Sequence, residues 1–284
     1  MYGPRILTRF LERPGPEDSA GLRWQYHSRS DRHSKVGSWG VALDLLATSS
    51  LLRAHADEGK VVLGVNHTMR DFATGRKKDL DLVVARPGAD ATGRARSLRS
   101  LVDEYQIPLT PEEEGTLHAL PDIHVAPVGA VLIALEAKAC MTAHVKALPR
   151  LYDELNSSHL CVHGASSQAL AIAYVQVNHA DQFISSNPKN VLLRSHGAEP
   201  ERTQHRQPDD TLRVLDKLTE IPRRSSNSGH GFDAIGVSVL ELANDGSPVR
   251  LVEQSPAPQS GDSFHYGSMI VRMAHEYDAV FSRI

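Results

Sequence analysis

The stretch that decides the fold runs from Val125 to Lys138 and reads VAPVGAVLIALEAK. Everything up to Leu135 is apolar, which indicates a buried strand, and the run then ends in Glu136, Ala137 and Lys138. Alternate residues of a strand share a face, so this pattern predicts that the Glu136 carboxylate and the Lys138 ammonium lie side by side. Charges where burial is predicted are costly unless they are paired or bind a metal. We therefore treat this strand end as a candidate site.

A second apolar run, over residues 80–85, carries the acid Asp81. Asp79 lies on the same predicted strand face, but Asp81 lies deeper in the run and is the better candidate. An Asp on one strand and a Glu-x-Lys on the next are the smallest set of side chains that metal-dependent phosphodiester hydrolysis needs. The acids hold a divalent ion, which activates water and neutralises charge on the phosphate. We assign Asp81, Glu136 and the carbonyl of Ala137 as Mg²⁺ ligands, with Lys138 beside the attacking water.

The remaining pattern predicts a mixed α/β layer sandwich in one domain, residues 1–284. We expect an irregular N-terminal arm with short helical pieces over residues 1–35, a helical insertion over 86–124, and a long loop over 185–208. Thr110 followed by Pro111 predicts the start of one helix of the insertion. The other predicted helices cover residues 38–55, 94–105, 142–158, 209–221 and 263–283, and the predicted strands cover 60–67, 78–85, 125–137, 169–177 and 234–240.

Composition bounds the class of protein more than its function. With 284 residues, 40% apolar and 23% charged, the chain has the make-up of a soluble globular protein with a large core. No stretch is apolar enough for a bilayer, the N-terminus lacks a secretion signal, and two cysteines favour a reducing cytoplasm. The net charge of −3 does not indicate nucleic-acid binding, although basic residues gather locally, as at residues 76–78.

Asp81 followed by Glu136-Ala137-Lys138 resembles the motif of the PD-(D/E)xK nucleases, over about residues 39–177. The resemblance implies a restriction-endonuclease-like three-layer core, with a mixed central sheet flanked by helices, and a Mg²⁺-dependent endonuclease for which Mn²⁺ can substitute. Many members carry a further metal-binding acid on the helix before the hairpin, which maps onto Asp44. The chain departs from the pattern in having no proline before Asp81 and in the long 86–124 insertion.

The same resemblance implies DNA as the substrate and bacterial anti-phage defence, by restriction or abortive infection, as the setting. A dimer is expected, because two sites cut two strands most easily. Donors for phosphate contact are expected on the helix that follows the Glu-x-Lys strand and in the basic loop after residue 222. These candidates are Lys146, Arg150, Asn156, Arg223 and Arg224.

Three other interpretations compete with this one. Glu136 and Lys138 can form a structural ion pair without catalysis. The fold can serve a non-cleaving module that binds nucleic acid or a signalling nucleotide. Finally, a zinc site can be assembled from two Cys and two His side chains, although their spacing is not that of zinc fingers; these are Cys140, His144, Cys161 and His163.

Overall fold

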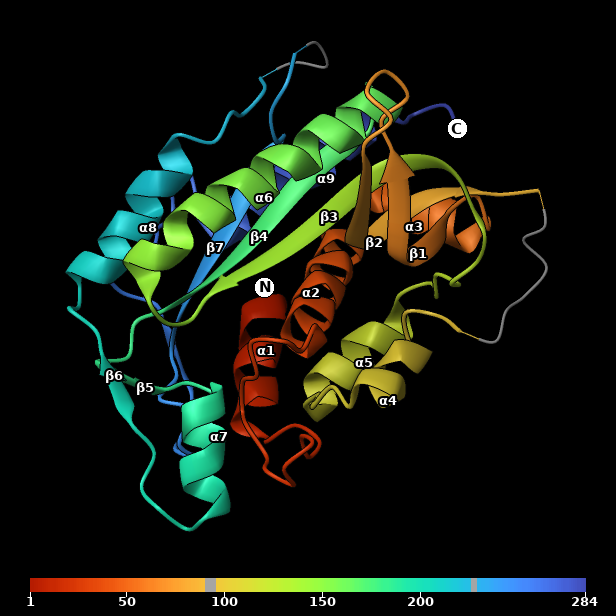
Figure 1. Cartoon of the computed structure of the whole chain (residues 1–284). Helices are drawn as coiled ribbons and strands as arrows, with labels where there is room; N and C mark the ends of the chain where they lie inside the picture. Colours follow the sequence, from red (N-terminus) through yellow and green to blue (C-terminus); the bar gives the residue numbers. More distant parts are fainter. Residues whose placement is uncertain (90–95, 226–228) are drawn as a thin grey trace.

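A six-stranded mixed sheet forms the centre of the computed structural model, which describes residues 1–89, 96–225 and 229–284 (Figure 1). The strand order is β1-β2-β3-β4-β7-β8. β1, β2 and β3 are antiparallel neighbours, β3, β4 and β7 run parallel, and β8 returns antiparallel at the edge. The predicted mixed α/β class is therefore confirmed. The strands are β1 (Val62–Arg70), β2 (Lys77–Pro87), β3 (Val128–Cys140), β4 (Leu170–Asn178), β7 (Ala234–Glu241) and β8 (Arg250–Val252).

Helices cover both faces of this sheet, with one apolar core on each side. One face packs against the first helices of the chain and the last one, and the other packs against α6 and α8 (Figure 1). β4 lies between these layers and is buried along its whole length, which explains why its sequence is an almost continuous apolar run. The covering helices are α1 (Gly3–Glu12), α2 (Arg32–Thr48), α3 (Ser50–Asp57), α6 (His144–Ala165), α8 (Asp209–Thr219) and α9 (Tyr266–Val280).

The predicted insertion between β2 and β3 is helical in its described part. It contains α4 (Ser100–Tyr105) and α5 (Pro111–Ala119). Thr110 begins α5 with a capping box, in which its side chain accepts a hydrogen bond from the Glu113 backbone N–H over 3.3 Å and Glu113 accepts one from the Thr110 N–H over 2.8 Å. The predicted helix over 94–105 begins later than expected, at Ser100, and residues 94 and 95 lie outside the described residues.

Two sequence predictions of local structure need correction. The helix expected over 38–55 is two helices, because Ser49 adopts an extended backbone conformation and caps α3 through its side chain. The N-terminal arm does contain helical pieces, as expected, namely α1 and the first turn of α2. The loop expected over 185–208 contains α7 (Pro188–Ser195) and the strand β6 (Arg202–Gln204), which pairs with β5 (Gln182–Ile184). Asn187 caps α7 and Pro188 starts it, which is the signal that sequence reasoning missed.

Among the helices in residues 1–89, 96–225 and 229–284, none is both long and apolar enough to cross a membrane.

Candidate active site

The candidate site lies where β2 and β3 separate. The two strands pair from Leu82 and Leu135 toward the insertion, but in the other direction β2 continues beside β1 while β3 continues beside β4 (Figure 1). Asp81 and Ala137 stand at this fork. The Ala137 backbone N–H donates a hydrogen bond to Asp81 Oδ2 over 2.7 Å. A side-chain carboxylate thus replaces the backbone acceptor that β2 no longer supplies.

The fork also directs a backbone carbonyl toward Asp81. In a strand, the N–H and C=O groups of one residue point to the same edge, as the exchange of both bonds in an antiparallel pair shows. Because the Ala137 N–H points at Asp81, the Ala137 carbonyl points toward the same open edge of β3. Asp81, Glu136 and Ala137 therefore bring carboxylate and carbonyl oxygens to one place.

Glu136 is the buried acid of the site, with only 3% of its side chain exposed. Its Oε1 accepts from Lys138 Nζ over 2.8 Å and lies 3.4 Å from Lys78 Nζ. Its Oε2 is buried and has no hydrogen-bond partner among the residues that the structure describes. An unpaired buried carboxylate oxygen is costly, so this atom is suited to accept from a water or to bind a cation.

Lys138 connects the strand to α6. Its ammonium contacts Glu154 Oε2 over 3.2 Å in addition to Glu136, and Glu154 in turn accepts from Arg150 Nε over 2.6 Å. Burial disfavours the charged ammonium, but the two carboxylates outweigh that cost and raise the pKa of Lys138. The lysine is therefore a charged donor at neutral pH, suited to hold a water or a phosphate oxygen and not to act as a base.

Asp81 is the acid whose proton affinity the site alters most clearly. Burial, followed by the negative charge of Glu136, raises the pKa of Asp81 to about 6, against an ordinary value of 3.8. The Ala137 N–H, the Lys138 charge and the Ser34 hydroxyl of α2 oppose this rise without cancelling it. The two carboxylates therefore repel each other, and a bound cation would relieve that repulsion.

This donor set fits a hard divalent cation. Mg²⁺ takes oxygen ligands, keeps several waters and is commonly held by one or two carboxylates. Asp81, Glu136 and the Ala137 carbonyl would hold it, and when bound it would lower the pKa of a coordinated water and polarise a phosphate. Within residues 1–89, 96–225 and 229–284, no three His, Cys, Asp or Glu side chains gather in a geometry that could hold a metal, so such an ion would depend on backbone and water oxygens as well.

Asp44 does not join the other two acids. Its Oδ1 accepts from the Tyr2 N–H over 2.7 Å, and its Oδ2 accepts from the Gly3 N–H and the Tyr266 hydroxyl, both over 2.9 Å. Ser34, which lies beside Asp81, is ten residues earlier on α2, or about 15 Å along a helix axis. The structure therefore corrects the assignment of Asp44 as a metal ligand and gives it the role of fixing the start of α1.

The residues predicted to contact nucleic acid differ in how exposed their side chains are. Lys146 and Arg150 are exposed on α6, on the same helix as Glu154. Asn156 is half-buried and its Oδ1 lies 3.1 Å from the His159 ring. Arg223 is exposed and stacks on Phe264, with 5.3 Å between its guanidinium carbon and the ring centroid. Arg150 is thus linked to Lys138, because both contact the Glu154 carboxylate.

Arg224 cannot contact phosphate in this structure, which corrects its prediction. It is buried, and its Nε donates to Asp233 Oδ1 over 2.7 Å. Its other nitrogens donate to the carbonyls of Ser167 and Ala169 over 2.9 and 2.7 Å. Arg224 therefore anchors the loop after α8 to the start of β4. Residues 226–228 of the predicted basic loop lie outside the described residues.

Two of the potential zinc ligands, Cys161 and His144, contact different parts of the protein. Cys161 is buried on α6 and its thiol donates to the Met69 carbonyl over 3.4 Å. His144 contacts the Asn178 carbonyl over 2.8 Å and stacks edge-on against His205, with ring centroids 4.6 Å apart. These side chains pack the β1–β2 hairpin and the start of α6, respectively.

Sequence reasoning missed three residues of the site. Lys78 pairs with the Glu136 carboxylate, and Glu154 pairs with the Lys138 ammonium. Ser34 lies beside Asp81. Lys78 lies in the basic run over residues 76–78 at the start of β2, which offered a signal. Glu154 and Ser34 lie on helices distant in sequence from both strands, and only the packing of α2 and α6 against the sheet reveals them.

Comparisons of this chain with protein-family models, with curated proteins and with solved structures find no match. The geometry of the site is therefore the basis for assigning a function.

Proposed function

We propose that this protein is a divalent-cation-dependent nuclease of the PD-(D/E)xK type that hydrolyses DNA phosphodiester bonds. The observation that carries the proposal is the fork between β2 and β3. There Asp81 accepts from the Ala137 N–H over 2.7 Å, beside a buried Glu136 whose Oε2 is unpaired in the described residues. Mg²⁺ is the expected ion and Mn²⁺ its substitute.

Each residue then has a chemical task. Asp81 and Glu136 hold the cation with the Ala137 carbonyl, and Lys138 donates to the attacking water or to a phosphate oxygen. Lys146 and Arg150 provide exposed positive charge on the adjoining helix, where a phosphate backbone can bind. The strand order and the parallel β3–β4 pair support a restriction-endonuclease-like core, with α2 and α6 as its flanking helices.

The proposal extends to the setting that the resemblance implies. A cytoplasmic enzyme of bacterial anti-phage defence, acting by restriction or abortive infection, is the role that we infer. A dimer is the expected state, since two sites are needed to cut both strands in one encounter. Light scattering coupled to gel filtration measures that state.

A non-cleaving binding module is the second candidate, and one observation favours it. Lys78 and Lys138 both lie close to Glu136 Oε1, at 3.4 and 2.8 Å, so the acid is already balanced by positive charge without a cation. A module of this kind would bind nucleic acid or a signalling nucleotide equally well in EDTA and in Mg²⁺.

Cleavage of supercoiled, linear and single-stranded DNA, and of RNA, with Mg²⁺ or with EDTA decides between the two. We expect Mg²⁺-dependent DNA cleavage that Asp81→Asn, Glu136→Gln and Lys138→Ala each reduce by at least about 100-fold. Asp79→Asn is the matched control, because Asp79 is an exposed acid on the same strand that contacts Thr68. Equal cleavage by the control and the three site variants would refute the proposal, and metal-independent binding without cleavage would favour the second candidate.

A further inference from the structure

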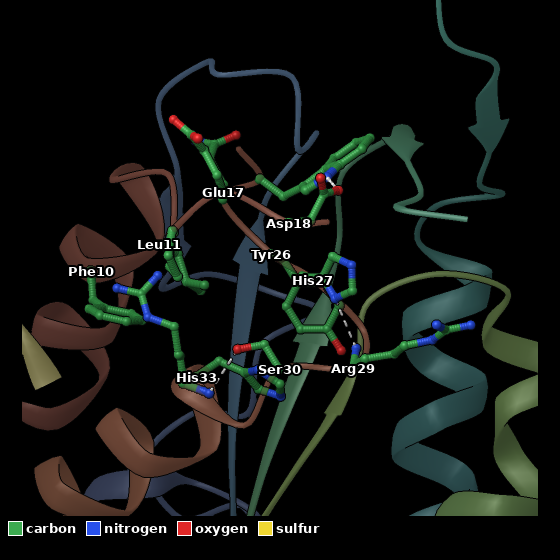
Figure 2. Close-up of a pocket in the computed structure, with 14 residues that line it drawn as sticks. Phe10, Leu11, Glu17, Asp18, Tyr26, His27, Arg29, Ser30 and His33 are labelled. Atoms are coloured by element: carbon green, nitrogen blue, oxygen red, sulfur yellow. Dashed lines mark hydrogen bonds between the residues drawn. The ribbon is translucent and has the colours of Figure 1, made fainter. Parts of the chain in front are cut away.

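A cavity of about 220 Å³ opens between the N-terminal arm and the start of α2 (Figure 2). Its walls carry five aromatic rings, together with the guanidinium groups of Arg29 and Arg32. In Figure 2, Phe10 and Leu11 line one side and Tyr26, His27 and His33 line the opposite side and the floor. The ring-bearing residues are Phe10, Trp24, Tyr26, His27 and His33.

Flat groups lie close to one another in the wall of the cavity. The Arg32 guanidinium carbon lies 4.8 Å from the centroid of the Phe10 ring, and the Tyr26 and His33 ring centroids are 4.7 Å apart with their planes tilted by 51°. Aromatic faces and a guanidinium plane bind planar heteroaromatic rings by stacking, and every nucleobase has such a face. The cavity therefore fits a planar ring better than a branched aliphatic group.

Polar groups at the wall can contact the edge of such a ring. Burial raises the pKa of Tyr26 to about 12, which keeps its hydroxyl a neutral donor, and burial lowers the pKa of His33 to about 4, which keeps its imidazole neutral. In Figure 2 no hydrogen bond joins the Tyr26 hydroxyl to another of the residues drawn. Tyr26 and His33 can thus donate to or accept from the edge of a base.

The two acids of the cavity already have partners in the protein. Asp18 already accepts from Trp24 Nε1 over 2.9 Å and from the Leu22 N–H over 3.0 Å. Glu17 pairs with Arg23 over 3.5 Å. The guanidinium of Arg29 is exposed and brings positive charge to the rim.

The cavity adjoins the candidate active site through α2. His33 is followed by Ser34, whose hydroxyl acts on the pKa of Asp81, and the charge of Lys138 acts on the pKa of His33. The charge of Arg150 likewise acts on the pKa of Tyr26. Cavities for drug-sized ligands are typically about 300–1,000 Å³, so this one has room for a single ring system and not for an oligonucleotide.

We propose that this cavity binds one unpaired nucleobase of the nucleic acid whose phosphodiester reaches Asp81 and Glu136. The inference rests on the proposed nuclease function. The phosphate would lie at the fork while the neighbouring base leaves its stack and enters between Phe10 and Tyr26. The enzyme would accordingly prefer single-stranded or locally unpaired DNA over a continuous duplex.

Binding of a fluorescein-labelled tetradeoxynucleotide, followed by anisotropy in EDTA, tests the site without cleavage. The partner probe is a tetramer of abasic deoxyribose residues with the same number of phosphates. We expect the base-bearing tetramer to bind about 5- to 100-fold more tightly, as one stacked base would give. Tyr26→Leu and Arg29→Ala should each weaken binding of the base-bearing tetramer. Tyr26→Leu should also remove most of the difference between the two tetramers.

The matched control is Arg5→Ala, an exposed arginine at the opposite end of α1 that pairs with Glu253. It should leave both affinities unchanged. Equal binding of base-bearing and abasic tetramers by the unmodified chain would overturn the proposal, as would a Tyr26→Leu variant that folds normally by circular dichroism and keeps the full difference. Binding of free dAMP as tightly as the tetramer would also overturn it, because the cavity would then serve a free nucleotide.

The nuclease proposal is judged separately, by cleavage in Mg²⁺. If Tyr26→Leu cuts single-stranded DNA as fast as the unmodified chain, the cavity assignment falls and the nuclease assignment stands. If no cleavage occurs under any condition but the base-dependent binding persists, the nuclease assignment falls and the base-binding cavity stands as part of a binding module.

Discussion

Replacing Asp81 by Asn should make the metal-free protein more stable while it removes the response to Mg²⁺. Burial and Glu136 raise the pKa of Asp81 from 3.8 to about 6, so the folded state disfavours the carboxylate relative to the unfolded chain. At about 1.4 kcal/mol per pKa unit, the full penalty is about 3 kcal/mol above pH 6. Because the side chain is half-buried, solvent screens part of this penalty, and we expect a gain of about 1–2 kcal/mol.

The pH dependence of this gain has a definite sign. Because the folded pKa is the higher one, the contribution of Asp81 to stability falls as pH rises from about 4 to about 6, where its carboxyl ionises less readily in the folded state than in the unfolded state. The amide that Asp81→Asn introduces does not titrate, so the variant should match the unmodified chain near pH 4 and exceed it above pH 6. The amide oxygen can still accept from the Ala137 N–H, so the fork itself is preserved.

Thermal unfolding in EDTA, at pH 4 and pH 7.5, measures this difference. For a chain of this size the gain corresponds to about 3–6 °C in melting temperature at pH 7.5. Mg²⁺ at about 100 times its dissociation constant should then stabilise the unmodified chain by about 2.7 kcal/mol and the variant far less. Asp79→Asn should change neither quantity. A variant that melts lower than the unmodified chain in EDTA at pH 7.5, or gains as much from Mg²⁺, would refute the reasoning.

Three further substitutions separate catalytic from structural roles. Lys138→Met should lower the cleavage rate by about 100- to 1,000-fold while DNA affinity measured in Ca²⁺ changes less than about threefold; a parallel loss of affinity would assign the lysine to binding alone. Arg224→Ala should cost about 3–5 kcal/mol in urea unfolding, because it leaves Asp233 buried without its ion pair, and the DNA affinity of the folded fraction should not change. Asp44→Ala should cost about 2–4 kcal/mol by removing the acceptor for α1 and Tyr266, with Mg²⁺ stabilising the variant as much as the unmodified chain; a lost response would restore Asp44 to the metal site.

The elements that the sequence predicts well are those with a local physical signal. The buried run of β4 and the Thr110 capping box each fix a strand or a helix start without help from distant residues. Asp81 also carries a local signal, because an acid inside an apolar run indicates that it has a partner. In the structure that partner is the Ala137 N–H, at 2.7 Å, on the strand that holds Glu136 and Lys138. The edge strand β8 has only three residues and was missed, because so short a segment has no periodicity to detect.

The residues that sequence reasoning misplaced depend on contacts between distant segments. Asp44 lies on a helix that is buried along most of its length, so the pattern does not tell which end of α2 faces the fork. Its partners Tyr2 and Tyr266 come from the two ends of the chain. Arg224 reads as part of an exposed basic loop, and only its pairing with Asp233, nine residues later, shows that it is buried. Such pairings are set by tertiary packing, which no local pattern encodes.

The fork explains why the acid pair tolerates a long insertion between its two strands. Pairing between β2 and β3 begins at Leu82 and Leu135, adjacent to Asp81 and Glu136, and ends at Pro87 and Val128, where the insertion joins. The insertion therefore attaches at the end of the ladder farthest from the acids, and its length does not alter the register that brings Asp81 to the Ala137 N–H. The insertion packs instead on the N-terminal region, through the Arg9–Glu113 ion pair and a 2.8 Å hydrogen bond from Trp39 to the Leu98 carbonyl. These two contacts support α1 and α2, the helices that line the proposed base cavity. Changes in the insertion should therefore affect substrate choice more than the chemistry at the fork.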